Sequence, residues 1–337
     1  MTKVLVTGAT GFIGLHCIAQ LLAQDYEVVG TVRSMSRKDE VVEAMSKAGL
    51  STDKLSLVEA DLTKDAGWDD AVNGCEYVLH VASPFIVGMP KHEDELIVPA
   101  VGGVERVLQA AIRAGVKKTV LTSSCAAIDK THDGKTHFTE ADWTDAEHPK
   151  TPPYNKSKTL AERRAWEICN AQTGDNKMAL AVINPAGVVG PVLSDDIGTS
   201  NVFIKRIITG EVPGNPKMHL GFVDVRDVAS LHLLAMQQDA ANGERFIASE
   251  REYWFREISE MFREAGFEKA PKRELPNFFV KAMGYINPDL KQLANFVGKE
   301  MYTASEKPKK ILGWKPRHAG ESLVETARYL TDNGLTD

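Results

Sequence analysis

A tyrosine and a lysine four residues apart form the pair in this chain best suited to move a proton. Tyr154 and Lys158 follow two prolines that favour the first turn of a helix, so both side chains should lie on one helix face. A phenol ordinarily ionises near pH ~10, but a neighbouring ammonium favours the phenolate. Tyr154 could then exchange a proton with a carbonyl or alcohol oxygen. The same spacing also occurs on ordinary solvated helix faces, so the surrounding sequence has to decide.

Two serines come directly after an apolar run. Lys117 to Thr122 is predicted to be a buried strand, and Ser123 and Ser124 follow at its carboxyl end. Open α/β sheets bind their ligands at this end of the strands. A serine hydroxyl there can donate a hydrogen bond to a substrate oxygen that becomes negatively charged. The alternative is that these polar residues only cap the strand.

A glycine-rich turn near the start of the chain is typical of a phosphate-binding site. The run Val4–Val6 is too short for a helix and reads as a buried strand, and a helical pattern follows Gly14. The turn between them offers backbone N–H groups and a helix N-terminus, which suit a pyrophosphate. We expect Gly8 to permit the tight turn, Gly11 to let the backbone approach phosphates, and Gly14 to allow close helix–strand packing. The spacing is G-x-x-G-x-x-G and not the G-x-G-x-x-G of the dinucleotide fingerprint.

Apolar runs alternate with helical patterns along the first three quarters of the chain. This alternation predicts an α/β fold with a doubly wound parallel sheet. The expected strands are Val4–Val6, Tyr26–Val32, Leu55–Glu59, Glu76–Val81, Lys117–Thr122, Met178–Ile183 and Arg245–Ala248, and the longest expected helices are Glu93–Ala114 and Tyr154–Thr173.

Glycine and proline interrupt the pattern after residue 188, which predicts a smaller, discontinuous C-terminal substrate lobe. The large dinucleotide-binding domain is expected to comprise residues 1–188, 222–248 and 318–335, and the substrate lobe residues 189–221 and 249–317. Asp227 is a candidate N-cap for a helix Val228–Gln237, and the last helix, near Ser322–Leu330, should pack on the large domain. A ligand crevice should lie between the lobes.

Composition narrows the class of protein. The 337 residues carry a net charge of −6 without a basic block, which argues against nucleic acid or an anionic membrane as a partner. The four cysteines are widely spaced and form neither a zinc pattern nor a disulfide framework. No stretch reaches the roughly 18 apolar residues of a membrane span. We therefore expect a soluble, cytoplasmic protein.

Eight motifs in order make the chain resemble the extended short-chain dehydrogenase/reductase superfamily, which has a Rossmann fold. They are TGATGFIG at residues 7–14, Asp61-Leu62, HVASP at 80–84, TSS at 122–124, YNKSK at 154–158, INPAGVVGP at 183–191, VRDVA at 225–229 and LGWKPR at 312–317. The chain looks most like the branch of dihydroflavonol 4-reductases and yeast-type aldehyde and ketone reductases. The stretches Thr31–Arg33 and His80–Pro84 carry that likeness.

The resemblance implies a role for each matching residue. Ser124 would be the hydrogen-bonding member of a catalytic triad, Tyr154 its acid/base and Lys158 the partner of the tyrosine, which would also hold the nicotinamide ribose. The cofactor-binding residues implied are Gly8, Thr10, Gly11, Phe12, Ile13, Gly14, Arg33, Asp61, Leu62, Ala82, Ser83, Lys158, Pro185 and Val188. Phe85 and Ile128 are candidate substrate contacts. A monomer or a homodimer that pairs the two longest helices is expected.

The end of the second strand predicts NADPH as the cofactor. Folds that bind NAD usually carry Asp or Glu there for the ribose 2′-hydroxyl, whereas this chain has Thr31-Val32-Arg33-Ser34. The Arg33 guanidinium suits a 2′-phosphate, because it can form paired charge-assisted hydrogen bonds. A solvated charge cluster is the alternative, although a cation is not what a helix N-terminus prefers.

No metal site is expected. The polar segment Lys130–Asp142 holds two histidines and three carboxylates, but without regular ligand spacing it reads as an exposed loop. Cys125 follows Ser124 without a partnered histidine and reads as a small buried residue.

These features predict NADPH-dependent reduction of an aldehyde or ketone to an alcohol. Largely apolar cleft candidates favour a medium-sized hydrophobic carbonyl compound over a phosphorylated sugar. A nucleotide-sugar epimerase or dehydratase is one alternative, although Cys125-Ala126 stand where such dehydratases carry an Asp-Glu pair. A non-enzymatic NADP-sensing regulator is another, although such proteins typically lose the Tyr and Lys that this chain keeps.

Overall fold

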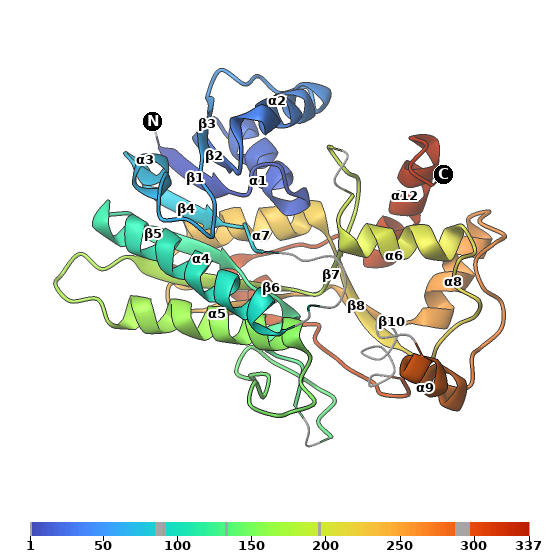
Figure 1. The fold of residues 1–337 in the computed structure, drawn as a ribbon. Helices are drawn as coiled ribbons and strands as arrows, with labels where there is room; N and C mark the ends of the chain where they lie inside the picture. Colours follow the sequence, from blue (N-terminus) through green and yellow to red (C-terminus); the bar gives the residue numbers. More distant parts are fainter. Residues whose placement is uncertain are drawn as a thin grey trace.

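A seven-stranded parallel sheet forms the centre of the molecule (Figure 1). This computed structural model describes residues 2–84, 90, 92–131, 134–194, 197–286 and 297–336. The strand order is β3-β2-β1-β4-β5-β6-β9. The strands are β1 (Lys3–Thr7), β2 (Glu27–Val32), β3 (Leu55–Glu59), β4 (Tyr77–His80), β5 (Lys118–Thr122), β6 (Ala179–Pro185) and β9 (Arg245–Ala248). The predicted doubly wound sheet is therefore confirmed, and each of its seven strands overlaps the predicted one.

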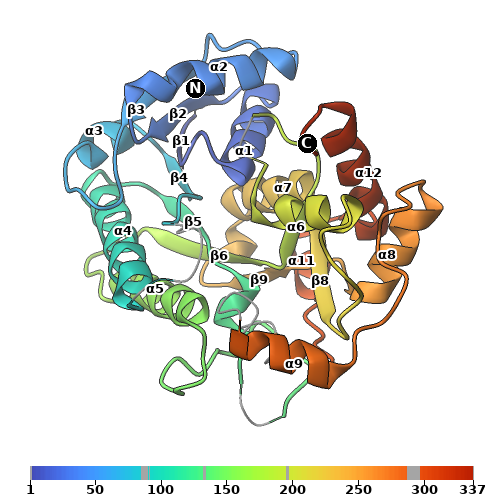
Figure 2. The same ribbon diagram turned by 45° about the vertical axis from the view of Figure 1, so that its right-hand side comes forward.

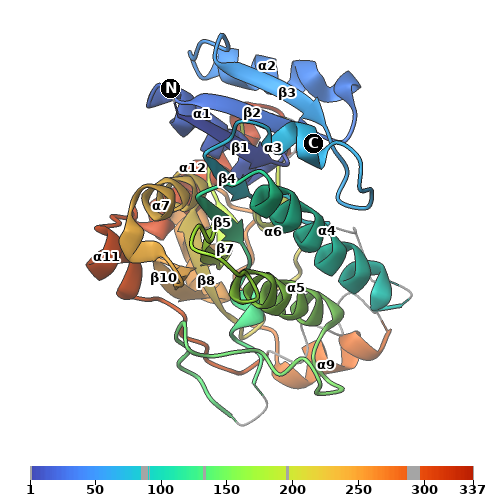
Figure 3. The same cartoon turned by 90° about the vertical axis from the view of Figure 1, so that its left-hand side faces the viewer.

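Helices cover both faces of this sheet. One face carries α1 (Phe12–Ala23), α2 (Lys38–Lys47) and α7 (Val225–Gln237), and the other carries α3 (Trp68–Val72), α4 (Asp94–Arg113) and α5 (Pro153–Asn170). Figure 3 shows α4 and α5 side by side on one side of the sheet and α7 on the other. The inner strands β1, β4, β5 and β6 are buried on both faces, as in parallel sheets generally, whereas the edge strand β3 is partly exposed along its length.

The strand order reverses between β1 and β4. β1 is parallel to both of its neighbours: Val4 lies opposite Val28 of β2 on one side and opposite Tyr77 of β4 on the other. The first half of the chain winds outward from β1 to β3, and the second half winds from β4 to β9. A crevice opens at such a reversal outside the carboxyl ends of the strands. The glycine turn after β1 and the serines after β5 end at this same edge.

A second, three-stranded sheet was missed by the sequence analysis. It has the order β10-β8-β7, with β7 (Gly187–Val189) parallel to β8 (His219–Asp224) and β10 (Arg251–Trp254) antiparallel to it. Strands of three to six residues between glycines and prolines are too short to show alternation. The helices around it are α6 (Thr199–Ile208), α8 (Phe255–Glu264), α9 (Asn277–Ile286) and α12 (Ala319–Asp332), while α11 (Lys307–Leu312) lies against α7 and β9 (Figure 2).

Two expectations about the C-terminal half are corrected. β8 continues to Asp224, so α7 begins at Val225, and its N-cap is Asp224, which accepts from Arg226 N at 2.8 Å. Asp227 was the wrong choice; its carboxylate instead accepts from Arg317 N at 2.8 Å. The last helix, α12, contributes Leu323 and Leu330 to the core shared with α6 and α8, so its apolar face packs on the second sheet, and its Glu325 pairs with Arg226 of α7. The residue bounds of the two domains stay a prediction.

Within the described ranges, each helix is too short or too polar to cross a membrane.

A buried histidine ties the end of β5 to α7. His232 Nδ1 lies 2.8 Å from Val228 O and its Nε2 lies 2.6 Å from Thr122 Oγ1. A carbonyl can only accept, so Nδ1 carries the proton and Nε2 accepts from the threonine hydroxyl. Burial lowers the pKa of His232 to about 4, although the Val228 carbonyl opposes the shift.

This lowered pKa predicts a loss of stability in mild acid. The unfolded histidine takes up a proton below about pH 6.5, whereas the folded one does so only near its lowered pKa. The free energy of unfolding should therefore fall as the pH drops below 6.5, with His232 contributing about 1–2 kcal/mol by pH 5. Urea unfolding at pH 7.5 and 5.0 measures this, with His232→Asn as the non-titrating comparison. An equal acid effect in parent and variant would show that His232 does not contribute.

Candidate active site

The glycine turn after β1 is tightly packed. Gly8 has φ of +72°, a conformation that favours glycine. A Cβ at Gly14 would lie 2.2 Å from the Gly8 carbonyl oxygen, so only glycine allows α1 to begin this close to β1. Gly11 N donates to Gly8 O at 3.0 Å, and Gly11 is the N-cap of α1 without a side-chain cap. Thr10, Phe12 and Ile13 lie in the same turn and first helical turn. The first N–H groups of α1 are left for a ligand.

The end of β4 is fixed against this turn. Thr7 Oγ1 accepts from Ala82 N at 2.9 Å and forms a second hydrogen bond, of 2.8 Å, with His80 Nδ1. Burial and, less strongly, the Lys158 cation lower the pKa of His80 to about 3. Burial therefore favours the neutral form of His80. Ala82 lies against Gly8, as a Cβ there would approach it to 3.1 Å.

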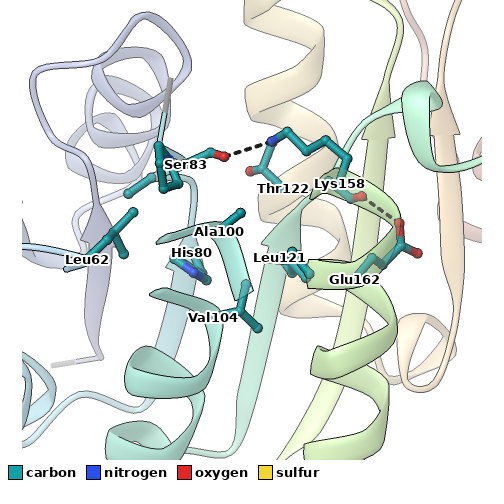
Figure 4. Close-up of a pocket in the computed structure, with 13 residues that line it drawn as sticks. Leu62, His80, Ser83, Ala100, Val104, Leu121, Thr122, Lys158 and Glu162 are labelled. Atoms are coloured by element: carbon teal, nitrogen blue, oxygen red, sulfur yellow. Dashed lines mark hydrogen bonds between the residues drawn. The ribbon is translucent and has the colours of Figure 1, made fainter. Parts of the chain in front are cut away.

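Lys158 joins the proposed cofactor segment to the tyrosine. Its Nζ donates to Ser83 Oγ at 3.0 Å and lies 5.8 Å from the centre of the Tyr154 ring, over its face. Figure 4 shows the lysine reaching across from α5 to Ser83, above a small cavity of about 20 Å³. The cavity is lined by Leu62, His80, Ala82, Ser83, Pro84, Ala100, Val104, Leu121, Thr122, Ser123, Lys158, Ala161 and Glu162.

The two serines after β5 differ in what their hydroxyls do. Ser123 is buried and its Oγ donates to Glu162 Oε2 at 2.5 Å. Ser124 is half-buried, and its Oγ accepts from Ala126 N at 3.1 Å as the N-cap of a short 3₁₀ turn. That bond uses an oxygen lone pair and leaves the O–H proton to donate. The second serine is thus the one suited to bind a substrate oxygen.

The Ser124 turn is tied to the start of α5. Asn155 Nδ2 donates to Ala126 O at 3.0 Å, and Thr144 Oγ1 donates to the same carbonyl at 2.8 Å. Since Asn155 adjoins Tyr154, these bonds link the backbone that carries the serine to the helix that carries the tyrosine. The three predicted catalytic residues therefore come from neighbouring segments of one edge of the sheet.

The predicted adenosine-binding residues follow β2 and β3. Arg33 is exposed, whereas Arg37 is paired with Glu40 at 2.7 Å. Asp61 Oδ1 accepts from the backbone N and the hydroxyl of Thr63, each at 2.9 Å, which orients the carboxylate and lowers its pKa. β2 pairs with β3, so both segments leave the sheet at the same edge.

The chain passes between the two sheets at the predicted nicotinamide segment. Pro185 ends β6 in the large sheet, and Val188 lies in the middle of β7 in the small one. Ala186 between them donates its N–H to Ala248 O at 3.0 Å. This segment is therefore fixed at the boundary of the two lobes.

Comparison with known proteins identifies the family. Residues 4–248 match the model of the NAD dependent epimerase/dehydratase family. The chain belongs to the extended short-chain dehydrogenase/reductase superfamily. It is 36% identical over 270 residues to tetraketide alpha-pyrone reductase 2 of Arabidopsis thaliana, covering 78% of this chain and 82% of that protein. It is 31% identical over 353 residues to the NADPH-dependent methylglyoxal reductase of Saccharomyces cerevisiae, covering 97% and 98%. The resemblance inferred from the motifs is thus confirmed.

Comparison with solved structures supports the same family. The yeast methylglyoxal/isovaleraldehyde reductase complexed with NADPH has a TM-score of 0.80 at 29% identity and covers 99% of each chain.

The glycine turn of this extended short-chain reductase fits a dinucleotide. Any side chain at Gly14 would collide with the Gly8 carbonyl, and the bare start of α1 presents N–H groups where a pyrophosphate would lie. The residues that would hold NADPH are those of the turn, Arg33 and Asp61 at the adenosine end, and Lys158 with Ser83 at the nicotinamide end.

The two predicted substrate contacts have different outcomes. Phe85 lies outside the described residues. Ile128 is fully buried and packs in a cluster with Cys125, Phe138 and Ile247. The structure therefore places Ile128 in the core and not on a surface that a substrate could touch.

Cys125 and the polar segment Lys130–Asp142 were also weighed as candidates for chemistry. Cys125 is buried, donates to Asn184 O at 3.2 Å, and burial raises the pKa of its thiol well above the usual value. Of the polar segment, His132 and Asp133 lie outside the described residues, and the described His, Cys, Asp and Glu form no cluster of three suited to a metal ion.

Two residues beside the site, Glu162 and Asn184, were not predicted from the sequence. Asn184, near the end of β6, is fully buried and donates to Glu162 Oε2 at 2.8 Å. Glu162 could have been noticed by helical spacing, because it follows Lys158 by four residues.

The close approach at Gly14 predicts a binding defect. Gly14→Ala should raise the dissociation constant of NADPH more than about tenfold, because α1 must move away from Gly8. Fluorescence titration of NADPH measures this without turnover. Gly320→Ala is the matched control, since it also adds a methyl group at the start of a helix, and its Cβ would meet only side-chain atoms of His318 and Tyr253. Unchanged NADPH affinity in folded Gly14→Ala would contradict the prediction.

Proposed function

We propose that this chain reduces a medium-sized hydrophobic aldehyde or ketone to an alcohol with NADPH, and that Tyr154 supplies the proton. The observation that carries the proposal is the position of Lys158, whose Nζ lies over the Tyr154 ring and bonds to Ser83. One lysine is thereby placed to act on both the phenol and the cofactor. Ser124, with its hydroxyl proton left to donate, completes the set.

The reaction class expected from the sequence is confirmed by the comparisons. This chain is an NADPH-dependent carbonyl reductase of the extended short-chain type, like the yeast methylglyoxal reductase that it matches over nearly its whole length.

The proposed chemistry divides the work among three side chains. When bound, NADPH supplies the hydride. Tyr154 donates its phenolic proton to the oxygen of the substrate, which becomes the hydroxyl of the alcohol. The Lys158 ammonium favours the phenolate that remains. Ser124 donates a hydrogen bond to the substrate oxygen where negative charge develops, which stabilises the transition state.

A hydrophobic substrate is the inference from the residues beside the site. The segments next to the serines and at the boundary of the lobes are apolar, among them Ala126, Ala186 and Val188. The yeast relative is described as a methylglyoxal/isovaleraldehyde reductase, and the Arabidopsis relative as a reductase of a tetraketide alpha-pyrone. Both descriptions name carbonyl compounds without a phosphate, which supports an unphosphorylated carbonyl substrate here.

Tyr154→Phe tests the proposal. Loss of the general acid should lower kcat/KM by about 10²- to 10⁴-fold, while NADPH affinity stays within about twofold. The assay follows NADPH oxidation with a panel of aromatic and aliphatic aldehydes, ketones and dihydroflavonols. Tyr77→Phe, at the opposite end of β4 from the site, is the control. If no panel member is turned over, or if Tyr154→Phe equals the parent, the proposed reaction is wrong.

A second variant tests how NADPH is chosen. Arg33→Ser should lower kcat/KM with NADPH about 10- to 100-fold and change the value with NADH less than threefold, because only the 2′-phosphate loses a partner. Arg113→Ser removes an exposed arginine paired with Asp69, far along α4, and should alter neither value. A parallel fall with both cofactors would mean that Arg33 does not read the phosphate.

A further inference from the structure

A buried carboxylate lies directly behind the catalytic pair on α5. Glu162 follows Lys158 by four residues and Tyr154 by eight, which is about one and two helical turns. Its side chain is fully buried, at 0% exposure. Lys158 and Glu162 line the same small cavity, as Figure 4 shows. The reaction proposed above gives this charge no task, and a buried charge requires partners.

Both oxygens of Glu162 are held by donors from distant segments. Oε1 accepts from Arg245 Nε at 2.6 Å. Oε2 accepts from Ser123 Oγ at 2.5 Å and from Asn184 Nδ2 at 2.8 Å. A guanidinium and an amide N–H can only donate, so the arrangement fits the ionised carboxylate. The ends of β5 and β6 and the middle of α5 thus meet at one group.

Arg245 anchors the network from β9. Its Nη1 donates to the carbonyls of Glu140 and Asp142 at 2.8 and 2.7 Å, and its guanidinium lies 3.8 Å from the centre of the Trp143 ring. A buried ion pair contributes little net stability, because desolvation opposes the attraction. The Arg245–Glu162 ion pair is therefore better explained by its effect on geometry, because it fixes the segments around it relative to one another.

Glu162 acts on the catalytic residues through their backbone. Asn184 Nδ2 also donates to the carbonyl oxygen of Ser124 at 3.2 Å. Ser123, the residue before Ser124, is held by its hydroxyl. The same carboxylate is part of the helix that carries Tyr154 and Lys158. It therefore joins the serine of the site to the tyrosine and lysine of the site.

We propose that Glu162 is a positioning residue for the reductase reaction: through Ser123 and Asn184 it fixes the Ser124 hydroxyl relative to Tyr154 and Lys158. The inference rests on the proposed function. It also explains why the second serine is the reactive one, because Glu162 occupies the hydroxyl of the first. Among the described residues, the printed contacts of Glu162 go to the segments that carry Ser124 and not to the glycine turn, so we expect its loss to affect kcat more than NADPH affinity.

Two substitutions break the network in different ways. Glu162→Gln removes the charge and replaces one of the two oxygens, which accept from Arg245, Ser123, Asn184 and, at 3.5 Å, Trp166, with a donor. It should lower kcat about 10- to 100-fold, as expected from misplaced reacting groups. Ser123→Ala removes one hydrogen bond and should lower kcat about 3- to 10-fold. In both, the NADPH dissociation constant should stay within twofold. Ser123→Thr keeps a hydroxyl and should retain most of kcat.

Thr119→Val supplies the matched control. Thr119 lies four residues before Ser123 on β5, is fully buried, and donates from Oγ1 to Met178 Sδ at 3.1 Å. Its substitution also deletes a buried hydroxyl from the same strand, but away from Glu162. We expect its kcat to stay within twofold of the parent. Thermal unfolding of all variants shows whether Ser123→Ala and Thr119→Val lose comparable stability.

The outcomes separate this inference from the function on which it rests. A fall in kcat for Ser123→Ala, restored by Ser123→Thr and absent in Thr119→Val, with unchanged NADPH affinity, supports the positioning role. If the parent is active and kcat is unchanged in folded Ser123→Ala and Glu162→Gln, the positioning role is wrong, while the proposed function stands. A parallel loss of kcat and NADPH affinity in these variants also overturns the positioning role. If Glu162→Gln does not fold, the Ser123 series decides. A parent that reduces no carbonyl compound overturns the proposed function and this inference together.

Discussion

Parallel pairing of β1, β4, β5 and β6 is the constraint on which the site depends. It brings the carboxyl ends of four strands to one edge, so the glycine turn, Ala82, Ser124 and Pro185 become neighbours although they are far apart in the chain. The reversal of strand order between β1 and β4 leaves room there for a ligand. A shift of one residue in the register of β5 would turn Ser123 and Thr122 to the opposite faces of the sheet.

Side chains beneath this edge hold each strand end in place. Thr122 faces α7 and bonds to His232, whereas Ser123 faces α5 and bonds to Glu162. Alternation along the strand sends these two neighbours to opposite faces, and each finds a buried partner. Ser124 then follows at the exposed end, where its hydroxyl can meet a substrate. The reactive geometry therefore depends on buried polar contacts as much as on the exposed residues themselves.

Much of the fold followed from local pattern, and the errors came from short or ambiguous segments. The strand β5 and the helix α5 were predicted correctly. A strand buried on both faces has a continuous apolar run, and a helix buried on one face has apolar residues at helical spacing. In the second sheet only β8 was anticipated, as a short strand ending at Val223, because its strands are just three to six residues long. The N-cap of α7 was misplaced because Asp224 and Asp227 are both acceptable caps, and only the extent of β8 selects the first. The packing of α12 was misassigned because an amphipathic helix does not encode which core its apolar face joins.

The sequence by itself determined the chemistry that is present: a glycine turn, a serine pair, a tyrosine and lysine on one helix face, and an arginine where an acid would select NAD. These are local patterns within a few residues of one another. The tertiary structure alone decided which serine hydroxyl is left to donate, and that Glu162 lies between Ser123, Asn184 and Arg245. Those contacts join residues 39, 22 and 83 positions apart. Such pairings depend on how whole strands and helices dock, which no local pattern specifies.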